Sequence, residues 1–215
     1  MKKTVALLIG CMLLYASSEA QYRVRRYPRS RPMEKRRLER LPEFKPSVNL
    51  SFGYGVPNLD KNELLGFYDY YRGSVNQAGP LFGSIDYQFR RTSSIGLMVS
   101  YGKVSAPYYD IFSPSSAPPA FTGHLENWSV MLNFVRYVPT RGKVNPYVRT
   151  GIGVNIWDQA YIDEDGNKAL EADDPTTLAY QVSLGLKFKL SKQSGLFIEA
   201  GYGKYILSGG LALKF

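Results

Sequence analysis

The sequence has little of what metal centres and nucleophilic enzymes are built from. Among 215 residues there is one Cys, Cys11, and one His, His124. Cys11 lies in an N-terminal segment that resembles a cleavable signal, so the rest of the chain has no thiol for a disulfide, a zinc site or a thiolate nucleophile. A single His excludes most two-residue metal and nucleophile–base schemes. We therefore expect no cofactor, no metal and no enzymatic activity.

Long apolar runs are also missing. After residue 20 no stretch approaches the ~18 apolar residues of a membrane helix. Residues 1–20 have a basic start, an apolar run and small residues at Ser18 and Ala20, which predicts a secretory signal too short to span a bilayer. Leu8-Ile9-Gly10-Cys11 also resembles a lipoprotein box, which would lipidate Cys11. The apolar run continues past Cys11, and this favours ordinary cleavage.

Most of the net positive charge comes from one segment. The whole chain carries +9, and residues 21–45 hold ten Lys and Arg against three Glu. Such a segment has too few apolar residues to fold alone, so we expect a solvated periplasmic tail or a binding arm for an anionic surface or a partner protein. Nucleic acid is not an expected partner of a secreted chain. Nine of the ten lie before Lys45: Arg23, Arg25, Arg26, Arg29, Arg31, Lys35, Arg36, Arg37 and Arg40.

From residue 46 the pattern changes to alternating apolar and small or polar residues, which is typical of strands with one apolar face. Short turns at 91–94, 139–143 and 191–194 alternate with long loops at 57–78, 105–123 and 158–175. Asp60 to Glu63 resembles a helix start and predicts a short surface helix that could extend to Tyr71. The eight expected strands cover 48–56, 81–90, 95–102, 128–137, 147–156, 178–189, 196–203 and 205–215.

Eight strands of about ten residues match the length that a tilted strand needs to cross a bilayer. We therefore predict an all-β fold for residues 46–215: an eight-stranded antiparallel up-and-down transmembrane β-barrel. Short turns at one end and long loops at the other indicate a bacterial outer membrane, with periplasmic termini and extracellular long loops. The alternative is a soluble, lipocalin-like barrel with its apolar face inside. The other face here is mainly Gly, Ser, Asn and Gln, which suits the filled interior of a small membrane barrel.

The last strand carries the most specific motif. Ser208, Gly210, Leu213 and Phe215 stand at the spacing with which many barrel proteins of outer membranes end. With this motif the chain resembles the small outer-membrane β-barrel family that includes the OmpA transmembrane domain and the OmpX-like proteins. The resemblance implies that these four residues form a signal for the barrel-assembly machinery. It is specific for architecture and implies no particular activity.

Charged residues on the small and polar face are expected inside the barrel: Asp86, Arg90, Arg149, Lys187 and Glu199, with Lys189 beside them. The interior of an eight-stranded barrel is filled by side chains, so buried charges should pair. We predict that Arg149 lies within ion-pair distance of Asp86 or Glu199. A gate or narrow ion path is the functional alternative to a purely structural network.

Two other clusters could carry chemistry. His124 and Glu126 share one strand face, but Ser129 has the opposite parity, so the sequence does not favour a catalytic trio. Asp163 to Asn167 lacks the Gly spacing of a calcium loop, and Asp165-Gly166 is more simply a hairpin turn.

Three functions are compatible with this reading. The first is a structural or surface-binding component in contact with outer-membrane lipid and lipopolysaccharide. The second is a subunit of an envelope or secretion assembly, docked through the Arg-rich segment to a periplasmic or envelope protein. The third is a narrow pore.

Overall fold

The computed structural model describes residues 44–64, 70–72, 74–110, 112, 114, 118–138, 140, 142–163, 165–170 and 175–215. The predicted signal at 1–20 lies outside the described residues. So does the basic segment 21–45, except for Phe44 and Lys45.

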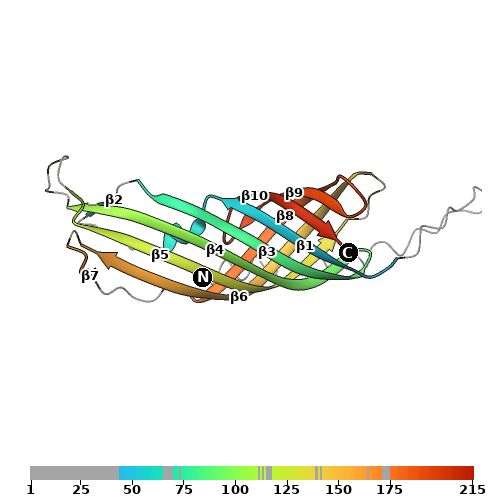
Figure 1. Ribbon diagram of the computed structural model, residues 1–215, viewed down its shortest axis with the longest axis horizontal. Helices are drawn as coiled ribbons and strands as arrows, with labels where there is room; N and C mark the ends of the chain where they lie inside the picture. The colour runs from blue at the N-terminus through green and yellow to red at the C-terminus, as the bar shows by residue number, and fades with distance from the viewer. Residues whose placement is uncertain are drawn as a thin grey trace, which may run out of the picture. The chain divides into compact units, whose positions relative to one another are not determined.

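Strands dominate the described residues, and they form one sheet (Figure 1). The elements are β1 (Ser47–Val56), η2 (Leu59–Glu63), β2 (Tyr70–Arg72), β3 (Asn76–Arg90), β4 (Ser93–Asp110), β5 (Phe121–Tyr137), β6 (Val144–Ile162), β7 (Lys168–Leu170), β8 (Leu178–Lys189), β9 (Ser194–Tyr202) and β10 (Leu207–Lys214). No helix of the described residues is long and apolar enough to cross a membrane.

Eight of the strands close into a ring of antiparallel neighbours in the order β1, β3, β4, β5, β6, β8, β9, β10. The first and last strands of the ring pair from Asn49–Lys214 to Val56–Leu207. Val48 and Phe215 add two backbone hydrogen bonds beyond this ladder. The eight-stranded antiparallel barrel is therefore the fold that the sequence predicts.

The two faces of the wall follow the predicted alternation. Large apolar side chains such as Phe52, Leu97, Ile152 and Leu184 are exposed on the outside, while Asn49, Ser84, Ser129 and Gln181 are buried inside. An exposed apolar band of this size is unfavourable in water and favourable in lipid.

Aromatic residues mark both margins of the band. Tyr54, Tyr101, Trp128, Tyr180 and Tyr202 face out toward the loop end, and Tyr87, Phe89, Phe134 and Phe215 face out toward the turn end.

Three strands are much longer than expected. β4, β5 and β6 have 18, 17 and 19 residues, so much of the loops predicted at 105–123 and 158–175 is strand. Figure 1 shows these strands reaching past β1 and β10 at the loop end. Pairing continues there because the inward side chains still find an apolar core: Leu64, Val104, Ala106, Tyr108, Phe121, Leu125 and Tyr161. The predicted loop contains four Pro, which favour irregular structure, so the sequence does not predict that the strands continue.

The surface helix expected from Asp60 toward Tyr71 is also wrong. η2 is a single short 3-10 helix that ends at Glu63, and residues 70–72 form strand β2 against β4. Strand β7 pairs in the same way with the end of β6.

Candidate functional site

Two polar networks occupy the lumen of the barrel. The turn-side network is built around Asp86, Arg149 and Glu199, which lie four or five residues from the turn ends of β3, β6 and β9. The loop-side network is built around Asp60 and Lys204, which lie in η2 and in the connection between β9 and β10.

Glu199 is the centre of the turn-side network. Its Oε1 accepts hydrogen bonds from Arg149 Nε at 2.8 Å and from the Tyr147 hydroxyl at 2.6 Å. Its Oε2 accepts from the Ser183 hydroxyl at 3.0 Å and from the Tyr205 hydroxyl at 2.8 Å. Four donors around one buried carboxylate offset the large cost of removing that charge from water.

Asp86 holds the other side of Arg149. The Asp86 carboxylate accepts from Asn133 Nδ2 at 2.6 Å and from the Ser84 hydroxyl at 3.1 Å, and it lies 4.0 Å from Arg149 Nη1. Arg149 Nη1 also donates to Ser84 at 3.2 Å. The predicted ion pair of Arg149 with Asp86 or Glu199 is therefore confirmed, and Arg149 lies within reach of both.

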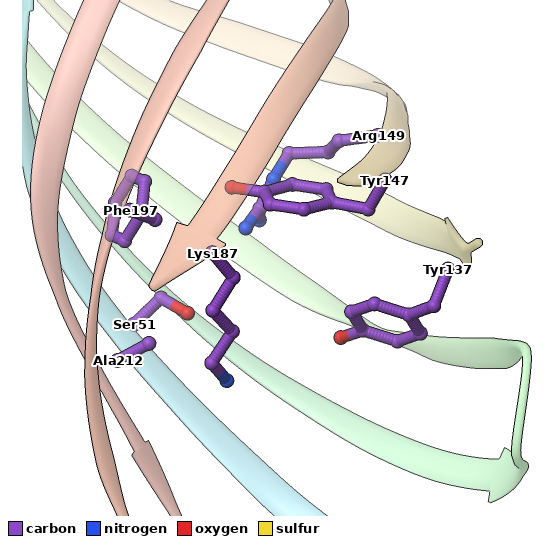
Figure 2. A pocket seen from close by; sticks show the side chains of 7 residues that line it. All are labelled: Ser51, Tyr137, Tyr147, Arg149, Lys187, Phe197 and Ala212. Carbon is purple, nitrogen blue, oxygen red and sulfur yellow. The ribbon is translucent and has the colours of Figure 1, made fainter. Parts of the chain in front are cut away.

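The remaining predicted interior cations differ from one another. Lys187 extends from β8 into the lumen beside Ser51 and Tyr137 (Figure 2), so the lumen carries two anions and two cations in this region. Arg90 does not point inward. A register irregularity between Gln88 and Arg90 ends the β3 ladder, and the exposed Arg90 guanidinium lies 5.9 Å from the Phe89 ring centre. Lys189, at the end of β8, is exposed as well.

The loop-side network was not predicted. After β1 the chain turns into the barrel and places Asn58 and Asp60 among buried residues. Lys204 Nζ donates to Asp60 Oδ1 at 2.5 Å and to Asn155 Oδ1 at 3.1 Å. The Asn127 side chain donates to Asp60 Oδ2 at 3.1 Å. The plug segment, residues 57–64, is thereby tied to β5 and to the β9–β10 connection.

Backbone contacts reinforce the plug segment. The amide of Leu59 donates to the Lys204 carbonyl at 3.1 Å, and the amide of Thr176 donates to Glu63 Oε2 at 3.1 Å. A weak sequence signal existed: Lys204 is a lone cation in a very short connection, and Asp60 and Glu63 stand close after β1. Only the fold brings residues 60 and 204 together.

Little empty space remains beside the turn-side network. The cavity lined by Ser51, Tyr147, Arg149, Lys187 and Phe197 has a volume of about 10 Å³, which is about the space of one water molecule. Inward-facing glycines explain the tight filling. A Cβ added at Gly185 would lie 2.3 Å from the Tyr147 ring, and one added at Gly55 would lie 2.6 Å from Tyr205. The ring of Tyr147 on β6 and the ring of Tyr205 in the β9–β10 connection therefore occupy the space over glycines of other strands.

The other candidate residues are placed as follows. His124 and Glu126 face outward, and Glu126 binds Lys103 at 2.6 Å. Ser129 lies inside, where its hydroxyl donates to Asn155 at 2.7 Å, so the barrel wall separates it from His124. Asp163 and Asn167 close a hairpin turn in which Gly166 has a φ of 82°. Among the described residues, no group of three His, Cys, Asp or Glu could hold a metal ion.

The residues of the predicted assembly signal lie in β10 and at its end. Ser208 is buried, and Gly210 lies against the backbone of β1, where a Cβ would approach the Phe52 carbonyl to 2.0 Å. Leu213 pairs with Leu50 in the closing ladder. The Phe215 side chain is 68% exposed. Recognition by the assembly machinery remains a prediction.

The family model that matches the chain agrees with this architecture. Residues 42–214 match the family model "Outer membrane protein beta-barrel domain". Similar solved structures include the N-terminal barrel of OprF from Pseudomonas aeruginosa (16% identity, TM-score 0.40, 79% of this chain and 97% of that one). Others are OprG from the same organism (11%, TM-score 0.45, 79% and 95%) and Ail from Yersinia pestis (14%, TM-score 0.40, 79% and 97%).

No curated protein matches the chain. The family match covers most of the sequence and all eight strands of the ring. The chain belongs to the family of outer membrane protein β-barrel domains, and its place is the bacterial outer membrane.

Proposed function

We propose that this barrel is a non-enzymatic anchor that presents the ends of β4, β5 and β6 as a binding surface outside the cell. The observation that supports this most is the length of these strands, which run 17 to 19 residues. A membrane-spanning strand needs about ten residues. Roughly half of each long strand therefore serves a purpose other than spanning the bilayer.

The exposed chemistry of the loop end suits a protein or lipid surface. Phe112, just beyond β4, is 94% exposed. Asp110 accepts a hydrogen bond from the Phe112 amide, and Asp163 and Asp165 lie at the same end of the barrel, after β6 and in the β6–β7 turn. An exposed aromatic beside acidic groups favours a partner that offers an apolar contact and positive charge.

The orientation is part of the same proposal. Secretion through a signal peptide, with both ends of an even-stranded barrel on one side, would leave the short turns periplasmic and the long strands outside. Phe112→Cys should react on intact cells with a thiol reagent that does not cross membranes. Lys192→Cys, in the β8–β9 turn, should react only after permeabilisation. The reverse labelling pattern would overturn the orientation.

The filled lumen weighs against a narrow pore. An ion crossing the barrel would have to displace both networks, and the small cavity beside the turn-side network has room for about one water molecule. We expect no conductance steps when the refolded protein is recorded in a planar bilayer. Regular steps would favour the pore instead.

The surface role is tested by crosslinking in living cells. A photo-crosslinking phenylalanine analogue at position 112 should form an adduct, while the same analogue at Leu190 should not. Leu190 is a suitable control because it is 65% exposed in a turn at the opposite end. If position 112 forms no adduct, and cells carrying Phe112→Ser have the same envelope integrity as wild type, a purely structural role is favoured.

The second candidate is a subunit of an envelope or secretion assembly docked through the Arg-rich segment. Deleting residues 21–43 distinguishes it. Normal insertion with loss of a partner that co-purifies from outer membranes would support docking. Unchanged co-purification would leave the segment as a tether.

A further inference from the structure

The two ends of the barrel carry different charge patterns. At the turn end, the β3–β4 turn supplies Arg90 and Arg91, and the β5–β6 turn is followed by Lys143. The β8–β9 turn supplies Lys189 and Lys192. Among the described residues of this end, none is Asp or Glu.

The chain adds two more cations where the barrel wall closes. Lys45 lies two residues before β1, and Lys214 ends β10, where it pairs with Asn49 of β1. All seven of these side chains are exposed. We call the seven residues the basic rim. The loop end, in contrast, has both signs: its carboxylates, among them Asp110, Glu126 and Asp158, alternate with cations such as Lys103 and Lys168.

The basic rim lies at the margin of the apolar band. Arg90 follows Phe89, over whose ring it stands, and Lys214 precedes the exposed Phe215. Aromatic side chains of membrane barrels gather at the level of the lipid headgroups. Arg and Lys at this level extend their charged tips to the headgroup phosphates while their stems stay in apolar surroundings. The rim is therefore within reach of phosphates around the barrel.

We propose that the basic rim binds the headgroups of anionic phospholipids in the leaflet at the turn end, and so surrounds that end with such lipids. The distribution of charge favours lipid over an acidic protein. A single protein partner would contact one side, whereas the cations come from all three turns and from the closing strands. Lipid is the partner that meets a barrel on every side. Each Lys or Arg near an anionic surface is worth about a fivefold local enrichment at low screening.

This inference is independent of the surface role proposed for the loop end and of which compartment the turns face. Its test uses the mature full chain refolded in bicelles with equal phosphatidylglycerol and phosphatidylcholine. After purification, the lipids retained by the protein are quantified by mass spectrometry. The rim variant is R90Q/R91Q/K143Q/K192Q. The control is K61Q/R72Q/K103Q/K168Q, which removes the same charge from the loop end.

We expect wild type and control to retain an excess of phosphatidylglycerol, and the rim variant to lose at least about fivefold of that excess. Raising the salt concentration should reduce the excess of wild type in the same direction. Equal retention by rim variant and control would overturn the proposal. A third variant, with the nine basic residues of 23–40 changed to Gln, tests whether that segment binds the lipid instead of the basic rim. If it alone abolishes the excess, the rim is not the binding site.

The rim variant should fold, because the replaced side chains are exposed and none is part of either lumen network. Folding of each variant is checked on a gel before lipids are counted. The heated, unfolded protein should migrate more slowly than the unheated, folded barrel.

Discussion

The two lumen networks have similar chemistry and different construction. In the turn-side network all three charges, Asp86, Arg149 and Glu199, stand on strands of the wall. In the loop-side network both charges, Asp60 and Lys204, stand on connections that turn into the barrel. Both pairs are buried.

The difference concerns how each pair could respond to a change. Backbone ladders hold strand residues in place, so a charge in the turn-side network cannot move outward without breaking the ladder. The plug segment is held by side-chain contacts and a few backbone bonds, so it can move outward if a contact is lost. The turn-side network should therefore act as a structural lock, and the loop-side network as a removable stopper.

The largest effect is expected for Glu199→Gln. Arg149 would keep only the more distant Asp86, and a buried cation would be left undercompensated. Breaking a buried pair in this way costs about 3–5 kcal/mol. Urea unfolding of the protein in lipid vesicles, followed by tryptophan fluorescence, measures it. Glu126→Gln is the matched control, because that carboxylate pairs with Lys103 on the outer surface. The free energy of unfolding of this variant should equal that of wild type. Equal destabilisation of both variants would contradict the stabilising role of the turn-side network.

Asp60→Asn should cost less, about 1–3 kcal/mol, because Lys204 stands on a connection and its ammonium group can move toward water when its partner is lost. Its clearer effect is access to the lumen. Ser100→Cys is buried inside β4, and its thiol should react with a charged thiol reagent in the Asp60→Asn background. In the wild-type background it should stay unreactive. Equal reaction rates in the two backgrounds would mean that the segment is not a stopper.

Gly185→Ala tests the packing that supports the lock. The added methyl would overlap the Tyr147 ring, whose hydroxyl binds Glu199. Because the ring can shift slightly, we expect a loss of about 1 kcal/mol, at the low end of overpacking effects. Gly142→Ala is the control, since a Cβ there meets no atom closer than 3.9 Å. A destabilised control or a neutral Gly185→Ala would argue against the ring-over-glycine arrangement.

Phe215→Ala should have the smallest effect on the folded barrel, because the side chain is 68% exposed and belongs to neither network. If the C-terminal pattern is an assembly signal, insertion in cells should nevertheless fall well below wild type. Refolding in vesicles without the cellular machinery should be near normal. Equal insertion of the variant and wild type in cells would leave Phe215 with a role only in closing the ring.

The sequence predicts the barrel wall well because the wall obeys a local rule. Alternation along each strand assigns residues such as Leu97 and Ser100 to opposite faces, and the same parity places Asp86, Arg149 and Glu199 inside. The rule fails where a ladder ends. Arg90 has the parity of an interior residue, but the irregularity after Gln88 releases it to the surface.

Alternation along the strands does not predict the structure of the loop end. Residues 105–110 and 121–127 continue as strands because an apolar cluster forms between segments that are far apart in the chain. Pro107 and the polar residues around it predict a loop, and the tertiary core outweighs that local preference.

The amino-acid sequence by itself determined the eight strands, the face of each strand and the ion pair at Arg149, because alternation and the cost of unpaired charge act at every position. Only the tertiary structure decided that Asp60 meets Lys204 and that the long strands extend past the apolar band. Those outcomes depend on contacts between residues up to 144 positions apart, and no local pattern encodes which distant partners will meet.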